Sequence, residues 1–150
     1  MATILIVDDD EVIRKLVSVA FERSGHSVSG ADGGDQALES ISQSLPDLVI
    51  LDVTMPGMDG WEVLRRLRKT GMRSKIKVIL LTGSGKESDF LMAWKLGADE
   101  YVTKPFDVDE LVSAATETLA MSHDELQQRR AQELEKANFL SRIESAFGQD

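Results

Sequence analysis

The chain has 150 residues, 42% of them hydrophobic, which is enough for one domain with a complete core. Its formal net charge is −9 and no run or stripe of Lys and Arg is present, so we expect no nucleic-acid binding by this segment. The absence of cysteine excludes disulfides and thiolate chemistry, and without a signal peptide or an apolar run of roughly 20 residues we expect a cytoplasmic protein with no membrane contact.

Strand-like and helix-like segments alternate along the chain. Short apolar runs rich in β-branched residues predict strands near 3–7, 26–30, 48–51, 77–81 and 101–103. Apolar residues with helical spacing, bounded by Gly, Pro or capping residues, predict helices near 11–24, 33–42, 60–70, 87–96 and 108–120. Five such units in succession predict an α/β fold, a parallel sheet covered on both faces. The common solution at this length is the flavodoxin-like (βα)5 doubly wound sheet with strand order 2-1-3-4-5.

Acidic residues follow two of the predicted strands. Asp52 comes directly after the apolar run 48–51, and Asp8 and Asp9 come directly after the strand at 3–7. The order 2-1-3-4-5 makes these strands neighbours, so the three carboxylates meet at the topological switch point of the sheet. Like charges this close repel one another unless a cation lies among them, which predicts a hard divalent ion.

Residues 122–150 lie beyond the last of the five units and predict a C-terminal helical extension. The segment is highly charged and carries a thin apolar stripe that Arg130 interrupts. It is either a linker helix that pairs with a partner helix, or a solvated helix that continues the domain or folds back on it. The stripe is too short and irregular for a heptad coiled coil.

Four short motifs stand at the ends of four of the five predicted strands. They are Asp8-Asp9 after the first strand, Asp52 after the third, Thr82 after the fourth and Lys104-Pro105 after the fifth. In this order and spacing, they resemble the receiver domain of two-component response regulators, including the chemotaxis regulators. The resemblance covers about residues 1–121, which we assign to a receiver domain, leaving 122–150 as the extension or linker.

The resemblance implies a phosphorylation-dependent signalling switch. Asp52 is then the phosphoacceptor, and the phosphoryl group comes from a sensor histidine kinase or a phosphotransfer protein. In the family Asp9, Asp52 and the backbone carbonyl of Thr54 bind Mg²⁺ (or Mn²⁺) directly, and Asp8 holds the ion through water. Lys104 is expected to contact the acyl phosphate, and the bond that joins it to Pro105 is cis in the family.

Two further positions carry the response in the family. Thr82 is the switch hydroxyl, which bonds to the phosphoryl group, and Tyr101 is the aromatic switch residue that turns inward as Thr82 moves. This movement changes the face formed by the fourth helix, fifth strand and fifth helix. On its own, Tyr101 would be interpreted simply as a half-buried strand aromatic.

The positions that set the phosphate lifetime depart from the best-known pattern of the family. They are Thr54, two residues after Asp52, and Ser84, two residues after Thr82. Neither side chain offers a carboxylate or carboxamide to orient an attacking water. We therefore expect slower autodephosphorylation than in chemotaxis-type regulators.

A phosphatase of the haloacid-dehalogenase type also uses an aspartyl phosphate and Mg²⁺, but it needs a second aspartate where this chain has Thr54. We therefore expect no enzymatic activity beyond the chain's own phosphorylation and dephosphorylation. The output is either a bound partner or a further domain of a longer regulator, with a homodimer through the receiver face or the C-terminal helix as a third arrangement. A winged-helix DNA-binding output is disfavoured because the helix at 108–120 contains no basic residue.

Overall fold

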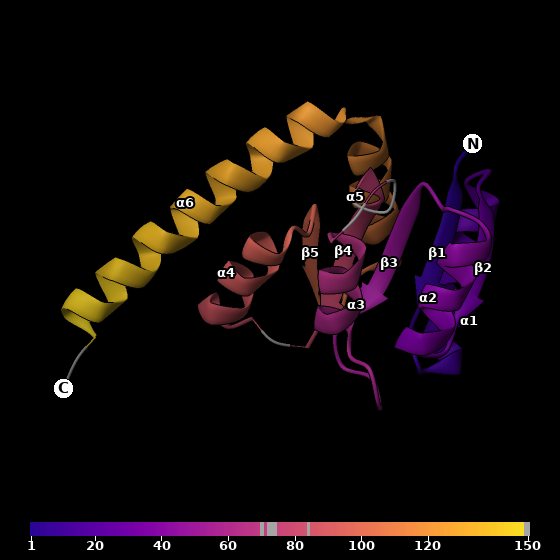
Figure 1. The fold of residues 1–150 in the computed structure, drawn as a ribbon, viewed down its shortest axis with the longest axis horizontal. Coiled ribbons are helices and arrows are strands. Elements are labelled where there is room, and N and C mark those ends of the chain that lie inside the picture. The colour runs from indigo at the N-terminus through magenta and orange to yellow at the C-terminus, as the bar shows by residue number, and fades with distance from the viewer. Residues whose placement is uncertain (70, 72–74, 84, 149–150) are drawn as a thin grey trace.

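The computed structural model describes residues 1–69, 71, 75–83 and 85–148. At its centre lies a parallel sheet of five strands in the order β2-β1-β3-β4-β5 (Figure 1). The strands are β1 (Thr3–Val7), β2 (Ser27–Ala31), β3 (Leu48–Asp52), β4 (Lys77–Thr82) and β5 (Glu100–Thr103). This is the flavodoxin-like doubly wound sheet that the alternating pattern predicts.

Helices cover both faces of the sheet and form two separate cores. On one face α1 (Glu11–Arg23) and α5 (Val108–Ala120) bury Phe21, Leu111 and their neighbours against the sheet. On the other face lie α2 (Gly34–Gln43), α3 (Gly60–Leu67) and α4 (Glu87–Leu96). All five residues of β3 are buried, which explains why its sequence is a continuous apolar run that ends in Asp52.

Element boundaries differ from the sequence-based expectations by one or a few residues. Strand β2 lies one residue later than expected, and its exposed Ser and Gly positions explain why its apolar signal is weak. Helix α3 ends at Leu67 rather than near 70, and residue 70 itself lies outside the described residues. Helices α4 and α5 have the expected bounds, and α4 is followed by Gly97, whose φ of +96° is the left-handed conformation that glycine adopts without strain.

The C-terminal extension is one helix, α6 (His123–Phe147), of 25 residues. It begins with a capping box, in which the Ser122 and Glu125 side chains each bond to the other's backbone N–H. Helix α6 packs along α4, and its last turns extend beyond that helix (Figure 1). The extension therefore folds back on its own domain, while pairing with a partner helix stays a prediction. Among the described residues, no helix is long and apolar enough to cross a membrane.

Candidate functional site

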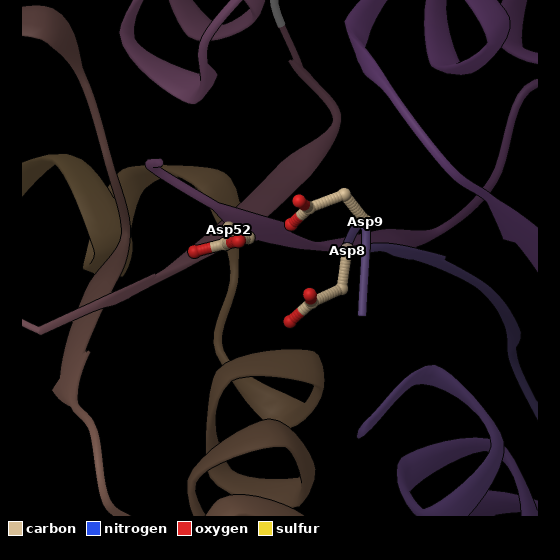
Figure 2. Close-up of side chains that lie close together, drawn as sticks. All are labelled: Asp8, Asp9 and Asp52. Atoms are coloured by element: carbon tan, nitrogen blue, oxygen red, sulfur yellow. The ribbon is translucent and has the colours of Figure 1, made fainter. Parts of the chain in front are cut away.

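Three carboxylates meet at the carboxyl edge of the sheet. Asp8 and Asp9 follow β1, and Asp52 is the last residue of the adjacent β3 (Figure 2). One carboxylate oxygen from each lies within 4.8 Å of those of the other two. Asp8 and Asp52 are buried, whereas Asp9 is exposed, so the cluster has a dry side and an open side. The structure thus brings together the acids that the sequence placed on neighbouring strands.

Lys104 adds one positive charge to this cluster. Its Nζ lies 3.1 Å from Oδ2 of Asp8 and 3.3 Å from Oδ1 of Asp52. The Lys104-Pro105 peptide bond is cis, and the Lys104 backbone N–H donates to the Thr82 carbonyl at 2.6 Å. Burial lowers the pKa of Lys104, but the hydrogen bond to Asp8 and the charge of Asp52 outweigh burial and raise it. Lys104 is therefore a fixed cation rather than a proton donor.

The charge on Asp52 is only partly balanced by Lys104. Burial and, to a smaller extent, the charge of Asp8 raise the pKa of Asp52 to about 6, although Lys104 and the Thr54 N–H oppose the rise. A carboxylate held in this way gains from additional positive charge. The donors are all carboxylate oxygens, one side of the cluster is open, and the acids outnumber the lysine, so these residues fit Mg²⁺ or Mn²⁺.

Backbone groups hold the acids in place. The N–H of Thr54 donates to Oδ1 of Asp52 at 3.4 Å, and the N–H of Asp10 donates to Oδ1 of Asp8 at 2.9 Å. Asp10 itself caps α1 by accepting from the N–H groups of Val12 and Ile13.

Gly60 is a site residue that sequence reasoning did not single out. The first turn of α3 lies directly on the backbone of the acceptor, and the Gly60 N–H donates to the Val53 carbonyl at 2.9 Å. A Cβ at this position would lie 2.8 Å from Cα of Val53 and would overlap the Asp52 carbonyl oxygen. The Asp59-Gly60 pair before an apolar helix is the signal that could have indicated this contact.

Thr82 and Tyr101 lie next to each other on β4 and β5. Both are buried, with 3% and 7% of their surface exposed, and the Tyr101 ring centroid is 4.3 Å from that of Phe90. Burial raises the pKa of Tyr101, while a hydrogen bond with the Thr82 side chain opposes the rise. Tyr101 is thus turned inward toward Thr82, and it is buried rather than half-buried.

The two positions expected to set the phosphate lifetime have different outcomes. Thr54 is exposed, and its backbone N–H donates to the acceptor carboxylate. Ser84 lies outside the described residues. The prediction about the phosphate lifetime therefore rests on the residue type at both positions and on the placement of Thr54 alone.

Comparison with known proteins agrees with the fold. The model of the response regulator receiver domain matches residues 4–116, so the chain belongs to this family. PhoB, the phosphate regulon transcriptional regulatory protein of Pseudomonas aeruginosa, is 41% identical over 111 residues, which are 74% of this chain and 48% of PhoB. The chain spans about half the length of the curated relatives it matches.

Solved structures show the same architecture. A putative response regulator from Chloroflexus aurantiacus superposes with a TM-score of 0.76 at 34% identity, covering 80% of this chain and 98% of that one. The chemotaxis protein CheY4 of Vibrio cholerae superposes with a TM-score of 0.75 at 29% identity, covering 79% and 98%. Both superpositions leave about a fifth of this chain uncovered, which is enough to contain the 25 residues of α6.

Proposed function

We propose that the chain is a phosphorylation-controlled switch whose phosphoacceptor is Asp52. The observation that carries this proposal is the placement of Asp52 within 4.8 Å of two other carboxylates and 3.3 Å from the Lys104 ammonium. A carboxylate is a weak nucleophile, so it must be held ionised and in line with the phosphorus atom. Its oxygen would form the new bond to phosphorus as the P–N bond of a phosphohistidine breaks, leaving the electron pair on the imidazole.

Each residue of the cluster has a role in this proposal. Asp9, Asp52 and the Thr54 carbonyl would bind Mg²⁺ or Mn²⁺, with Asp8 reaching the ion through water. The ion supplies positive charge for the phosphoryl oxygens when bound. Lys104 would provide a second, permanent positive charge 3.3 Å from Asp52.

The response would pass through Thr82 to Tyr101. The Thr82 hydroxyl would donate to a phosphoryl oxygen, and Tyr101 occupies the inward position beside it. This change would alter the face formed by α4, β5 and α5, which a partner or an output domain reads. The protein would act in the cytoplasm, with a sensor histidine kinase or phosphotransfer protein as its phosphodonor.

Beyond its own phosphorylation and dephosphorylation we propose no enzymatic turnover. Because Thr54 and Ser84 lack a carboxylate or carboxamide, we expect the phosphorylated form of this domain to last longer than that of a chemotaxis regulator. Dephosphorylation within seconds would contradict this expectation. A homodimer through the receiver face or α6 is one further arrangement, and nucleic-acid binding by this segment is not proposed.

Labelling with a small phosphodonor tests the proposal. The chain is incubated with acetyl phosphate and Mg²⁺, and the intact mass is measured before and after Asp52→Asn. We expect one added phosphoryl group on the native chain and none on the variant. Labelling that survives Asp52→Asn would contradict the assignment, and multiple turnover of a phosphate ester would indicate a phosphatase of the haloacid-dehalogenase type instead.

A further inference from the structure

Helix α6 covers a cavity beside the inward Tyr101. The cavity measures about 300 Å³ and lies between α4, β5 and α6. Its apolar lining comes from Phe90, Trp94 and Tyr101 in the domain and from Ala137 and Leu140 in α6, and its charged lining residues are Glu100, Arg129, Glu133 and Lys136. An apolar cavity of roughly 150 Å³ accepts a benzene ring, so this one has room for a phenol side chain. Tyr101 therefore borders a space into which its own ring can turn.

The base of α6 is held more firmly than its far end. Arg129 donates to the Asp99 carbonyl at 2.5 Å, and Arg130 donates to the Ala98 carbonyl at 3.1 Å and pairs with the Asp99 carboxylate. In the later turns, Phe139 and Phe147 are 57% and 86% exposed. The turns that cover the cavity thus lie between a fixed base and an exposed end.

The contacts of α6 depend on where the Tyr101 ring lies. With the ring inward on Phe90, the cavity under Ala137 and Leu140 is not filled by a side chain. With the ring outward, it would pack on both residues and on Trp94. Filling a cavity adds dispersion contacts and removes apolar surface from water, so the outward ring holds α6 more tightly.

We propose that α6 is an intramolecular ligand of the α4–β5 face, and that the position of Tyr101 sets how tightly it binds. The proposal rests on the proposed phosphorylation of Asp52. Phosphorylation draws Thr82 toward Asp52 and holds Tyr101 inward, which empties the cavity and loosens residues 133–147. The structure combines an inward Tyr101 with a docked α6, so the inward ring does not abolish docking. The loosened helix leaves the α4–β5 face accessible to a partner.

Hydrogen exchange of the full chain with Mg²⁺, with and without beryllofluoride, tests the proposal. We expect amides in 133–147 to exchange about tenfold faster with beryllofluoride, while those in 123–132 change little. Unchanged or slower exchange in 133–147 would overturn the proposal. The same samples are followed by ¹⁹F NMR, which reports bound beryllofluoride independently of α6.

The two measurements separate the two proposals. Without a bound ¹⁹F signal, the proposed function fails and the inference fails with it. With a bound signal and unchanged exchange, only the inference fails. Linkage is reciprocal, so Arg130→Ala, which weakens the base of α6, should raise beryllofluoride affinity, by at most the factor by which beryllofluoride loosens α6 in the native chain.

Two variants alter the cavity itself. Ala137→Phe fills it from α6, so exchange in 133–147 should stay slow and should no longer respond to beryllofluoride. Ala131→Phe, at an exposed position of the same helix, is the matched control and should respond like the native chain. If the larger side chain at 137 prevents docking, Tyr101→Ala gives a second test. It removes the moving ring, so exchange should stay fast in both conditions, and a retained response in either cavity variant would overturn the proposal.

Discussion

Asp52 is a carboxylate whose ionised form is disfavoured by its surroundings. Its pKa lies near 6 because of burial and the neighbouring Asp8, despite the Lys104 ammonium at 3.3 Å. A divalent ion bound to the same oxygens would favour the ionised form. Protons and the metal ion therefore compete for Asp52 in a pH range close to neutrality.

This competition predicts how magnesium binding changes with pH. Above pH 6 Asp52 is ionised and ready to bind, whereas below pH 6 each bound ion must displace a proton. The affinity should then fall by about tenfold per pH unit. Calorimetric titration between pH 5 and 7.5 measures it, with Asp52→Asn as the control that should lose this part of the pH dependence. Equal slopes for the two proteins would contradict the assignment.

The same pKa predicts that Asp52→Asn stabilises the metal-free protein. The pKa of Asp52 is about 6 when folded and 3.8 in the reference state, so the folded chain binds more protons between these values. Stability therefore falls as pH rises from about 4 to 6, and the loss is complete above pH 6. Removing the charge should raise the free energy of unfolding at pH 7.5 by about 1–2 kcal/mol.

Urea unfolding at pH 7.5 and at pH 4 measures this effect. At pH 4 the native Asp52 is already protonated in the folded state, so the advantage of Asn should nearly disappear. Magnesium should also reduce the advantage at pH 7.5, because only the native chain keeps all three carboxylates. A variant that is less stable than the native chain at pH 7.5 without metal would show that Asp52 makes a net stabilising contact.

At the scale of single elements, the start of α3 controls the acceptor strand. Gly60→Ala would place a methyl group against the Asp52 carbonyl and 2.8 Å from Cα of Val53, so α3 or the end of β3 must shift. We expect a loss of about 1–3 kcal/mol in the free energy of unfolding and slower labelling of Asp52 by acetyl phosphate. The matched control is Gly85→Ala, where a Cβ would meet none of the described atoms within 4 Å. Native-like labelling by the Gly60 variant would show that the shift does not reach Asp52.

Elements and the acidic cluster could be predicted because both depend on local pattern. The continuous apolar run of β3 indicates a strand buried on both faces, and parallel strands bring their last residues to one edge, so Asp8, Asp9 and Asp52 had to meet. Gly60 was not predicted as a site residue because its role depends on the distance between α3 and β3. Tertiary spacing of this kind leaves no periodicity in the sequence.

The extension shows the same limit more sharply. Arg130 looked like an interruption of an apolar stripe, yet in the structure it faces the domain and pairs with Asp99. The partner lies 31 positions earlier and is one of many acidic residues in a chain of net charge −9. Its charge was visible in the sequence, but which acid it would meet was not.

For the whole molecule, Asp99 is the junction between the domain and the extension. Its buried carboxylate accepts from the Val78 N–H at 2.9 Å and pairs with Arg68 from the end of α3 and Arg130 from α6. Burial lowers the pKa of Arg68, and the charge of Asp99 opposes this effect. One carboxylate thus balances two guanidinium groups that would otherwise repel each other.

This imbalance predicts unequal effects of removing either partner. Asp99→Ala leaves two partly buried cations facing each other, so we expect a loss of about 3–5 kcal/mol in the free energy of unfolding. Arg130→Ala leaves Asp99 paired with Arg68 and bonded to Val78, so the expected loss is only about 1 kcal/mol.

Urea unfolding of the two variants and of the double variant measures the coupling between Asp99 and Arg130. Arg142→Ala, at an exposed position near the end of α6, is the control and should change stability little. If Asp99 mattered only for holding α6, the two single variants would lose the same amount and the double variant no more. A larger loss for Asp99→Ala would instead mean that α6 is attached to a carboxylate the domain already needs for Arg68. In that case docking of α6 would add a contact to a junction that is stable without it, as a reversible attachment requires.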